Sequence, residues 1–310
     1  MKKIIYILAI TLIQVGCVTD PLKEINEGKW NHEKTVLDIG FEFQIGQGDI
    51  VVLDDKTGAI ELKVAVGLVP DLSKTEMKSL QLPFGAKSSI SVGETLDFDN
   101  ATNSASIMVT SATGQSREYT ITMIPFIETL EGSYEIDDLV VYGGTGPEYG
   151  GASVIPMMNK SWLWSDSDGP GKELDNSLTF TFEGLTEEGN TFGTVTNDAG
   201  DDGKYADFIY TRDPVTDVNN FYRAIPKGES KWLRDYQQGK IIFTFSDGST
   251  HLAELIGAGT EDMGNGKSKT TENQALVFNL SGQDDWNKIY SDYDKFVKRP
   301  RRYWIDITKQ

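Results

Sequence analysis

The feature that most constrains this chain is a two-residue alternation of apolar and polar side chains in short runs. Three such runs lie at residues 39–44, 49–53 and 59–66. Alternation places every apolar side chain of a strand on one face, so each run predicts a half-buried β-strand. The stretch 54–58 between the second and third runs ends in Gly58, which suits a hairpin turn. The chain is therefore expected to be all-β.

The pattern continues through the first part of the chain. Later runs lie at residues 88–92, 95–98, 105–110 and 118–123, while 72–80 is expected to be a short helical segment. Seven short strands in roughly ninety residues are typical of an immunoglobulin-like β-sandwich. Residues 35–128 are therefore expected to form such a domain.

The composition changes near Thr129. Five of the six tryptophans and ten of the twelve tyrosines lie beyond Leu130. Candidate strands in this region lie at 133–142, 177–183, 191–196, 205–211, 220–225, 240–245, 251–256, 275–280 and 303–307. Residues 284–296 have helical character, and 257–273 is expected to be a long, mobile polar loop. Residues 129–310 therefore predict a larger antiparallel β domain, either a jelly-roll sandwich or a closed lipocalin-like barrel.

The N-terminus has the order of a secretory leader. Lys2 and Lys3 precede an apolar run at residues 4–13, and Cys17, the only cysteine, follows Gly16. The run is about half the length needed to span a bilayer. The end of the leader resembles a bacterial lipobox, although Gln14 stands where an apolar residue is usual. The resemblance implies a signal peptide at residues 1–17, lipidation at Cys17 and a lipid anchor in the outer membrane, facing the cell surface.

Residues 18–34 are polar and are expected to form a tether, with Trp30 docked on the first domain. The chain carries a formal charge of −18, and removal of the leader leaves 27 basic against 47 acidic residues. Nucleic-acid binding needs a cationic surface, so nucleic acid is excluded as a general partner.

The aromatic residues of the second domain suggest a site for sugars. Sugar rings stack on aromatic planes, while carboxylates bind their hydroxyl groups. Trp162 and Trp164 would share one face of an extended strand, with Asp166 at its edge. Burial of both indoles in the core, or of one alone, is the alternative. If both are buried, the prediction passes to Tyr149, Trp232 and Trp286.

A glycine-rich stretch at 142–151 predicts a loop with Glu148 and Tyr149 at its tip. It is a candidate binding loop or an ordinary turn. A second loop carries Asp198, Asp201 and Asp202, which suggest Ca²⁺ or a solvated acidic turn, although the spacing of an EF-hand is absent.

The basic cluster at residues 295–302 suits either an anionic sugar or internal ion pairs. No serine elbow accompanies the two histidines, so no catalytic residue is assigned. A glycosidase needs only two carboxylates, which an acidic chain can supply.

Two segments of the first domain, DDKTGAIELKVAVG and ASIMVTSATGQSREYTITM, resemble the immunoglobulin-like accessory domains of bacterial polysaccharide-utilisation lipoproteins. The whole arrangement resembles the surface glycan-binding proteins of starch-utilisation-type systems. The resemblance implies a non-catalytic lipoprotein that holds a polysaccharide or oligosaccharide for an outer-membrane transporter and surface enzymes. A glycoside hydrolase or lyase and a structural adhesin are the alternatives.

Overall fold

The structure is a computed structural model that describes residues 22–310. The expected leader and the lipidation site Cys17 lie outside the described residues. The chain divides into two compact units, each described here by itself. The first contains residues up to Glu42, Gln47–Leu62 and Pro70–Ile124, and the second contains Phe43–Gly46, Lys63–Val69 and Pro125–Gln310. The main change of unit therefore falls close to the expected boundary, but two short earlier segments also belong to the second unit.

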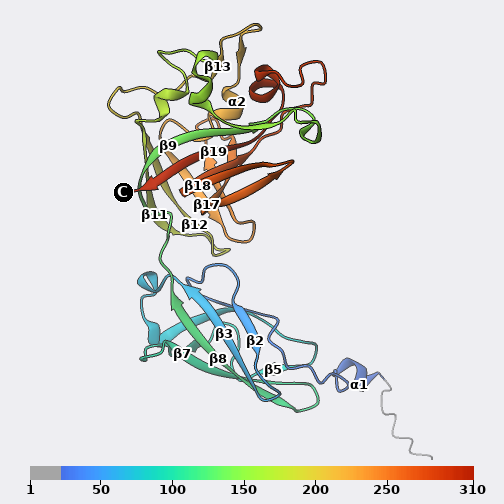
Figure 1. Cartoon of the computed structure of the whole chain (residues 1–310). Helices are drawn as coiled ribbons and strands as arrows, with labels where there is room; N and C mark the ends of the chain where they lie inside the picture. Colours follow the sequence, from blue (N-terminus) through green and yellow to red (C-terminus); the bar gives the residue numbers. More distant parts are fainter. Residues whose placement is uncertain (1–21) are drawn as a thin grey trace, which may run out of the picture. The chain divides into compact units, whose positions relative to one another are not determined.

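The first unit is built from two antiparallel sheets. One has the strand order β2-β3-β8-β7-β5 and the other β1-β4-β6 (Figure 1). The bounds are β1 Asp38–Phe41, β2 Asp49–Val52, β3 Thr57–Val64, β4 Thr75–Gln81, β5 Lys87–Ser88, β6 Thr95–Leu96, β7 Ser104–Thr110 and β8 Ser116–Pro125, with the 3₁₀ turn η2 Leu72–Lys74. The 3₁₀ turn η1 Val66–Leu68 belongs to the second unit. The alternation that predicts these strands places Ile60, Leu62 and Ile121 in the core. The immunoglobulin-like topology itself stays a prediction.

Three expectations for this part of the chain are wrong. Residues 72–80 form mainly strand β4, because Thr75 and Met77 alternate into the core while their neighbours face outward. Residues 28–34 are not a free tether, since the Lys34 ammonium is buried and lies 2.8 Å from the Asp55 carboxylate. Trp30 is exposed rather than docked, and the short helix α1, Lys23–Asn26, precedes it.

The second unit is a closed antiparallel barrel of eight strands. Their order is β9-β11-β12-β15-β16-β17-β18-β19, and β19 pairs back with β9 (Figure 1). The bounds are β9 Gly132–Gly143, β11 Ser177–Leu185, β12 Thr191–Asp198, β15 Gly228–Asp235, β16 Lys240–Thr244, β17 Thr250–Gly264, β18 Lys267–Asn279 and β19 Pro300–Lys309. Because the sheet closes on itself, the second unit is a barrel and not a jelly-roll sandwich.

Aromatic side chains fill the barrel. An eight-stranded barrel is just wide enough for inward side chains to fill it. Trp232 on β15 is 1% exposed, and its ring lies 6.2 Å from that of Phe180 on β11. The Trp232 indole N–H donates to the Thr181 and Thr194 carbonyl oxygens at 3.2 and 3.1 Å. Trp232, expected as a possible ligand residue, is therefore a core residue.

The predicted mobile loop at 257–273 is instead the outer half of the β17–β18 hairpin. Its turn contains Asn265 and Gly266, both with positive φ, which a tight hairpin turn requires. The hairpin contacts the outer face of the barrel, where Glu261 accepts a hydrogen bond of 2.6 Å from the Trp304 indole. Trp304 is buried there in an apolar cluster that includes Val140 and Val277.

Long connections gather at one end of the barrel, where Figure 1 places β13 and α2. They contain η3 Pro147–Tyr149, β10 Ser153–Pro156, η4 Met157–Leu163, η5 Pro170–Glu173, β13 Ile209–Tyr210, β14 Thr216–Asp217, α2 Asn219–Tyr222 and η6 Asp294–Lys298. Three predictions for this region are wrong or too long. The strand predicted at 205–211 is only the short β13, and the strand predicted at 220–225 overlaps helix α2. The segment 284–296, predicted to be helical, is helical only near its end. These connections form a cap over the barrel end.

Candidate functional site

The two neighbouring tryptophans of the cap do not share a face. Trp162 and Trp164 lie at the end of the 3₁₀ segment η4 rather than in a strand, so the two-residue spacing turns them apart. Trp162 is 52% exposed and Trp164 is 5% exposed. The Trp164 ring packs edge-on against Tyr222 and Phe296, with centroid distances of 6.2 and 5.7 Å. Trp164 therefore holds the cap together, and only Trp162 is available to a ligand.

The glycine-rich loop is anchored by a buried carboxylate. Asp294, fully buried, accepts hydrogen bonds from the Thr145 backbone N–H at 2.6 Å and from the Thr145 hydroxyl at 2.8 Å. The loop also packs too closely for side chains: a Cβ on Gly151 would lie 1.8 Å from the Thr145 carbonyl oxygen, and Gly144 has a φ of +122°. Glycine is needed here for close packing, so the loop has a defined shape.

Three exposed rings come together on this anchored loop and the segment that follows β18. The Tyr149 and Trp286 ring centroids lie 5.9 Å apart, and the Tyr290 hydroxyl donates to the Tyr149 carbonyl oxygen at 3.2 Å. Tyr149, Trp286 and Tyr290 are 65%, 56% and 59% exposed. We call these three residues the aromatic ledge. Exposed rings that lie together and are held in place mark a candidate binding surface.

Polar groups lie on the two segments that carry the ledge. Glu148 is exposed beside Tyr149 on the same loop. The Lys160 ammonium lies 3.0 Å from the Asp292 carboxylate and 5.1 Å from the centroid of the Trp162 ring. The Lys160–Asp292 ion pair connects η4, which carries Trp162, to the segment that carries Trp286 and Tyr290. The Lys160 ammonium also covers part of the Trp162 ring.

The basic cluster at the C-terminus is internally paired. Arg299 and Arg301 contact the Asp284 carboxylate at 2.9 and 3.0 Å, and Arg302 contacts Glu261 at 2.7 Å. Of the two predicted roles, internal pairing fits these contacts.

The structure thus brings together Glu148, Tyr149 and Trp286 from the predicted site and separates the rest. Asp166 is exposed, but no contact joins it to the ledge. Sequence reasoning missed Tyr290, four residues after Trp286. The sequence pattern did not indicate Tyr290, because this residue lies in a turn, where it has a positive φ, and does not belong to a regular helix or strand.

The carboxylates of the acidic loop near Asp198 take part in local contacts. Asp202 lies 2.7 Å from the Lys172 ammonium, and the Asp198 carboxylate accepts the Gly200 backbone N–H. Asp201 is exposed. Within residues 22–310, no group of three or more histidine, cysteine, aspartate or glutamate side chains could hold a metal ion.

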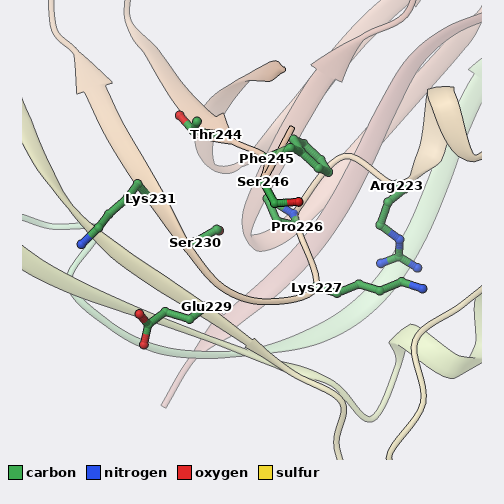
Figure 2. Close-up of a pocket in the computed structure, with 9 residues that line it drawn as sticks. All are labelled: Arg223, Pro226, Lys227, Glu229, Ser230, Lys231, Thr244, Phe245 and Ser246. Carbon is green, nitrogen blue, oxygen red and sulfur yellow. The ribbon is translucent and has the colours of Figure 1, made fainter. Parts of the chain in front are cut away.

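A cavity of about 490 Å³ opens at the cap end of the barrel, where β15 and β16 part (Figure 2). Strand pairing between them stops at Lys231 and Thr244. Its lining includes Arg223, Lys227, Ser230, Phe245 and Ser246.

A groove of about 520 Å³ lies on the outer barrel surface between β10 and β18. Burial raises the pKa of the Asp138 carboxyl in this groove. Burial also raises the pKa of Asp306, although the Lys269 ammonium 2.8 Å away acts in the opposite direction. The groove is therefore polar, and the ion pair between buried Lys269 and partly buried Asp306 lines it.

Comparison with known proteins gives no family assignment: the chain matches no protein-family profile, and no curated protein is significantly similar to it. In the part of the chain that the structure describes, no helix reaches the length and apolarity needed to cross a membrane.

Proposed function

We propose that this protein is a non-catalytic lipoprotein that binds a polysaccharide or oligosaccharide on the aromatic ledge. The observation that carries the proposal is the gathering of three more-than-half-exposed residues, Tyr149 on the loop anchored by buried Asp294, and Trp286 and Tyr290 on the segment that follows β18. Aromatic rings stack on the apolar C–H faces of sugars, and stacking contributes about 1 kcal/mol per ring.

The anchoring supports binding because a fixed surface loses little conformational entropy when the ligand arrives. Thr145 fastens the glycine loop to Asp294, and its hydroxyl also accepts the Asp285 backbone N–H at 2.7 Å. Both segments of the ledge are thus tied to one threonine. Glu148 provides a carboxylate for sugar hydroxyl groups at the ledge margin.

The ledge favours internal segments of an extended chain over a chain end. Its rings lie on two exposed segments, whereas the cavity described above lies at the β15–β16 seam and the groove lies beside β10. An exposed ledge leaves both ends of a bound glycan free. Longer oligosaccharides should therefore bind more tightly until they cover the three rings.

The cellular setting belongs to the same proposal. Lipidation at Cys17 would hold the protein at the outer membrane, and the first unit would act as a spacer. The bound glycan would pass to an outer-membrane transporter and surface enzymes. No nucleic acid is expected as a partner, given the excess of acidic residues.

A polysaccharide panel tests the proposal. The soluble chain beginning at residue 18 would be run in affinity gels containing neutral and acidic polysaccharides, beside its Tyr149→Ala/Trp286→Ala double variant. We expect at least one polysaccharide to retard the unchanged chain and not the variant, with no reducing sugar released. Equal retardation of both proteins would contradict the ledge, and release of sugar would favour a hydrolase.

A further inference from the structure

We infer that the cavity between β15 and β16 is a second binding site, which takes an oxyanion such as a carboxylate or sulfate group on a small ligand. Its volume of about 490 Å³ falls within the usual range for small-molecule sites. The inference does not depend on the aromatic ledge, which belongs to other loops of the cap.

The lining is basic in a protein that is strongly acidic. Arg223, Lys227 and Lys231 contribute three cationic side chains, against the single carboxylate of Glu229. Figure 2 shows the charged ends of Arg223 and Lys227 on one side, while those of Glu229 and Lys231 point the other way. The cavity therefore has one basic end.

Lys227 is the cation available at that end. Lys231 contacts the Glu183 carboxylate at 2.9 Å, and Arg223 contacts Glu173 at 2.6 Å. Among the described residues, Lys227 forms no ion pair, and its ammonium lies 5.5 Å from the centroid of the Tyr205 ring. The Arg223 guanidinium lies 5.9 Å from that same centroid, so both cations face one ring.

Two donors lining the cavity are buried without a partner. The Arg223 Nε–H and the Ser230 hydroxyl are buried and form no hydrogen bond within residues 22–310. A buried donor without a partner costs about 1–3 kcal/mol, so such groups are uncommon in folded proteins. An oxyanion would accept hydrogen bonds from donors of this kind while neutralising Lys227.

Phe245 gives the cavity an apolar wall. Its ring packs against that of His251 at a tilt of 55°, with a centroid distance of 4.8 Å, which fixes the wall in position. An apolar wall beside cationic donors suits a small organic acid with a ring or carbon chain. Sulfate alone would occupy the basic end, and a sugar acid would also contact Phe245.

The test titrates the ¹⁵N-labelled soluble chain with sodium sulfate, sodium glucuronate and glucose at constant ionic strength. We expect shifts near Ser230 and Ser246 with sulfate or glucuronate and none with glucose. Lys227→Gln and Ser230→Ala should each weaken binding by about fivefold to tenfold, because each removes a charge-assisted or direct hydrogen bond.

Two control variants distinguish binding in this cavity from nonspecific attraction of anions to positive charge and from binding at the aromatic ledge. Lys267→Gln removes the same charge on the exposed hairpin, and Trp286→Ala disrupts the ledge; both should leave anion binding unchanged. Binding of sulfate alone or of glucuronate alone would identify the anion and support the site. No binding by either anion, equal binding of glucose, or equal loss with Lys267→Gln would overturn it.

Discussion

The two units differ in where they expose large apolar side chains. In the first unit, Val51, Val52 and Leu53 are exposed along the edge strand β2 and just beyond it. The barrel has no free edge in its closed sheet, and its exposed rings instead gather at Tyr149 and Trp286 on the cap. The arrangement of the exposed apolar side chains therefore differs between the units.

This difference follows from how each sheet ends. An open sheet exposes its outermost strand, so apolar residues there are spread along one line. Closure lets the barrel fill with large rings such as Trp232, and the chain then uses long connections to cover one end. Those connections can hold a ligand-binding surface, because buried groups such as Asp294 fix them from below.

The largest expected effect separates the two neighbouring tryptophans of the cap. Trp164→Ala should lower the free energy of unfolding of the barrel unit by about 3–5 kcal/mol, because it leaves a cavity among Tyr210, Tyr222 and Phe296. Trp162→Ala is the matched control and should cost less than about 1 kcal/mol. Urea unfolding followed by circular dichroism measures both.

Neither substitution should affect the first unit, so the urea midpoint of its unfolding transition should be unchanged. Equal destabilisation by the two variants would show that Trp162 is also part of the core. The distinction between core and exposed aromatics would then be lost.

The next effect tests the anchor of the ledge. Asp294→Asn should lower the free energy of unfolding by about 3 kcal/mol, because the amide has one oxygen in place of the two carboxylate oxygens that accept hydrogen bonds from Thr145. Asp292→Asn removes only a partly exposed pair with Lys160 and should cost less than about 1 kcal/mol. Thermal melts of both variants measure the difference, and equal melting temperatures would contradict an anchoring role.

A smaller effect depends on pH. Burial acts to raise the pKa of Glu128, but hydrogen bonds from Thr191, Leu130 and Tyr236 and the Arg234 charge outweigh it, so the pKa is lowered. A lowered pKa stabilises the fold above the usual glutamate pKa, and this stabilisation is lost as pH falls through the folded-state pKa.

Glu128→Gln should therefore cost about 2 kcal/mol near neutral pH, and the difference from the unchanged protein should shrink below about pH 4. Urea midpoints at several pH values measure this, with Glu131→Gln as the exposed control. A difference that does not vary with pH would show that Glu128 acts by packing rather than by charge.

Strands with one buried face could be predicted from the sequence. Strand β3 alternates exposed and buried residues from Thr57 to Val64, and β7 and β8 also lie within a few residues of their expected bounds. The outer half of the β17–β18 hairpin could not be predicted from alternation, because many of its residues are exposed on both faces. Its Asn265-Gly266 pair was the available signal, since that pair favours a tight hairpin turn.

The candidate site was predictable only in part. The glycine loop and Tyr149 follow from local sequence, and Trp286 from its residue type. The contact between Tyr149 and Trp286 cannot be predicted from local sequence, because it depends on the hydrogen bonds between Thr145 and Asp294, which are 149 residues apart. Trp162 and Trp164 show the opposite case, where a local pattern suggested a platform and the 3₁₀ backbone turned one ring into the core.

The most direct test of the aromatic ledge is a calorimetric titration of Trp286→Ala and Trp30→Ala with a polysaccharide that retards the unchanged chain. Both tryptophans are more than half exposed, but Trp30 belongs to the first unit. We expect Trp286→Ala to bind roughly tenfold more weakly with an unchanged melting temperature, since it removes one stacking ring. Trp30→Ala should bind as the unchanged chain does. A folded Trp286→Ala variant with full affinity, or an equal loss in both variants, would contradict the ledge as the binding surface.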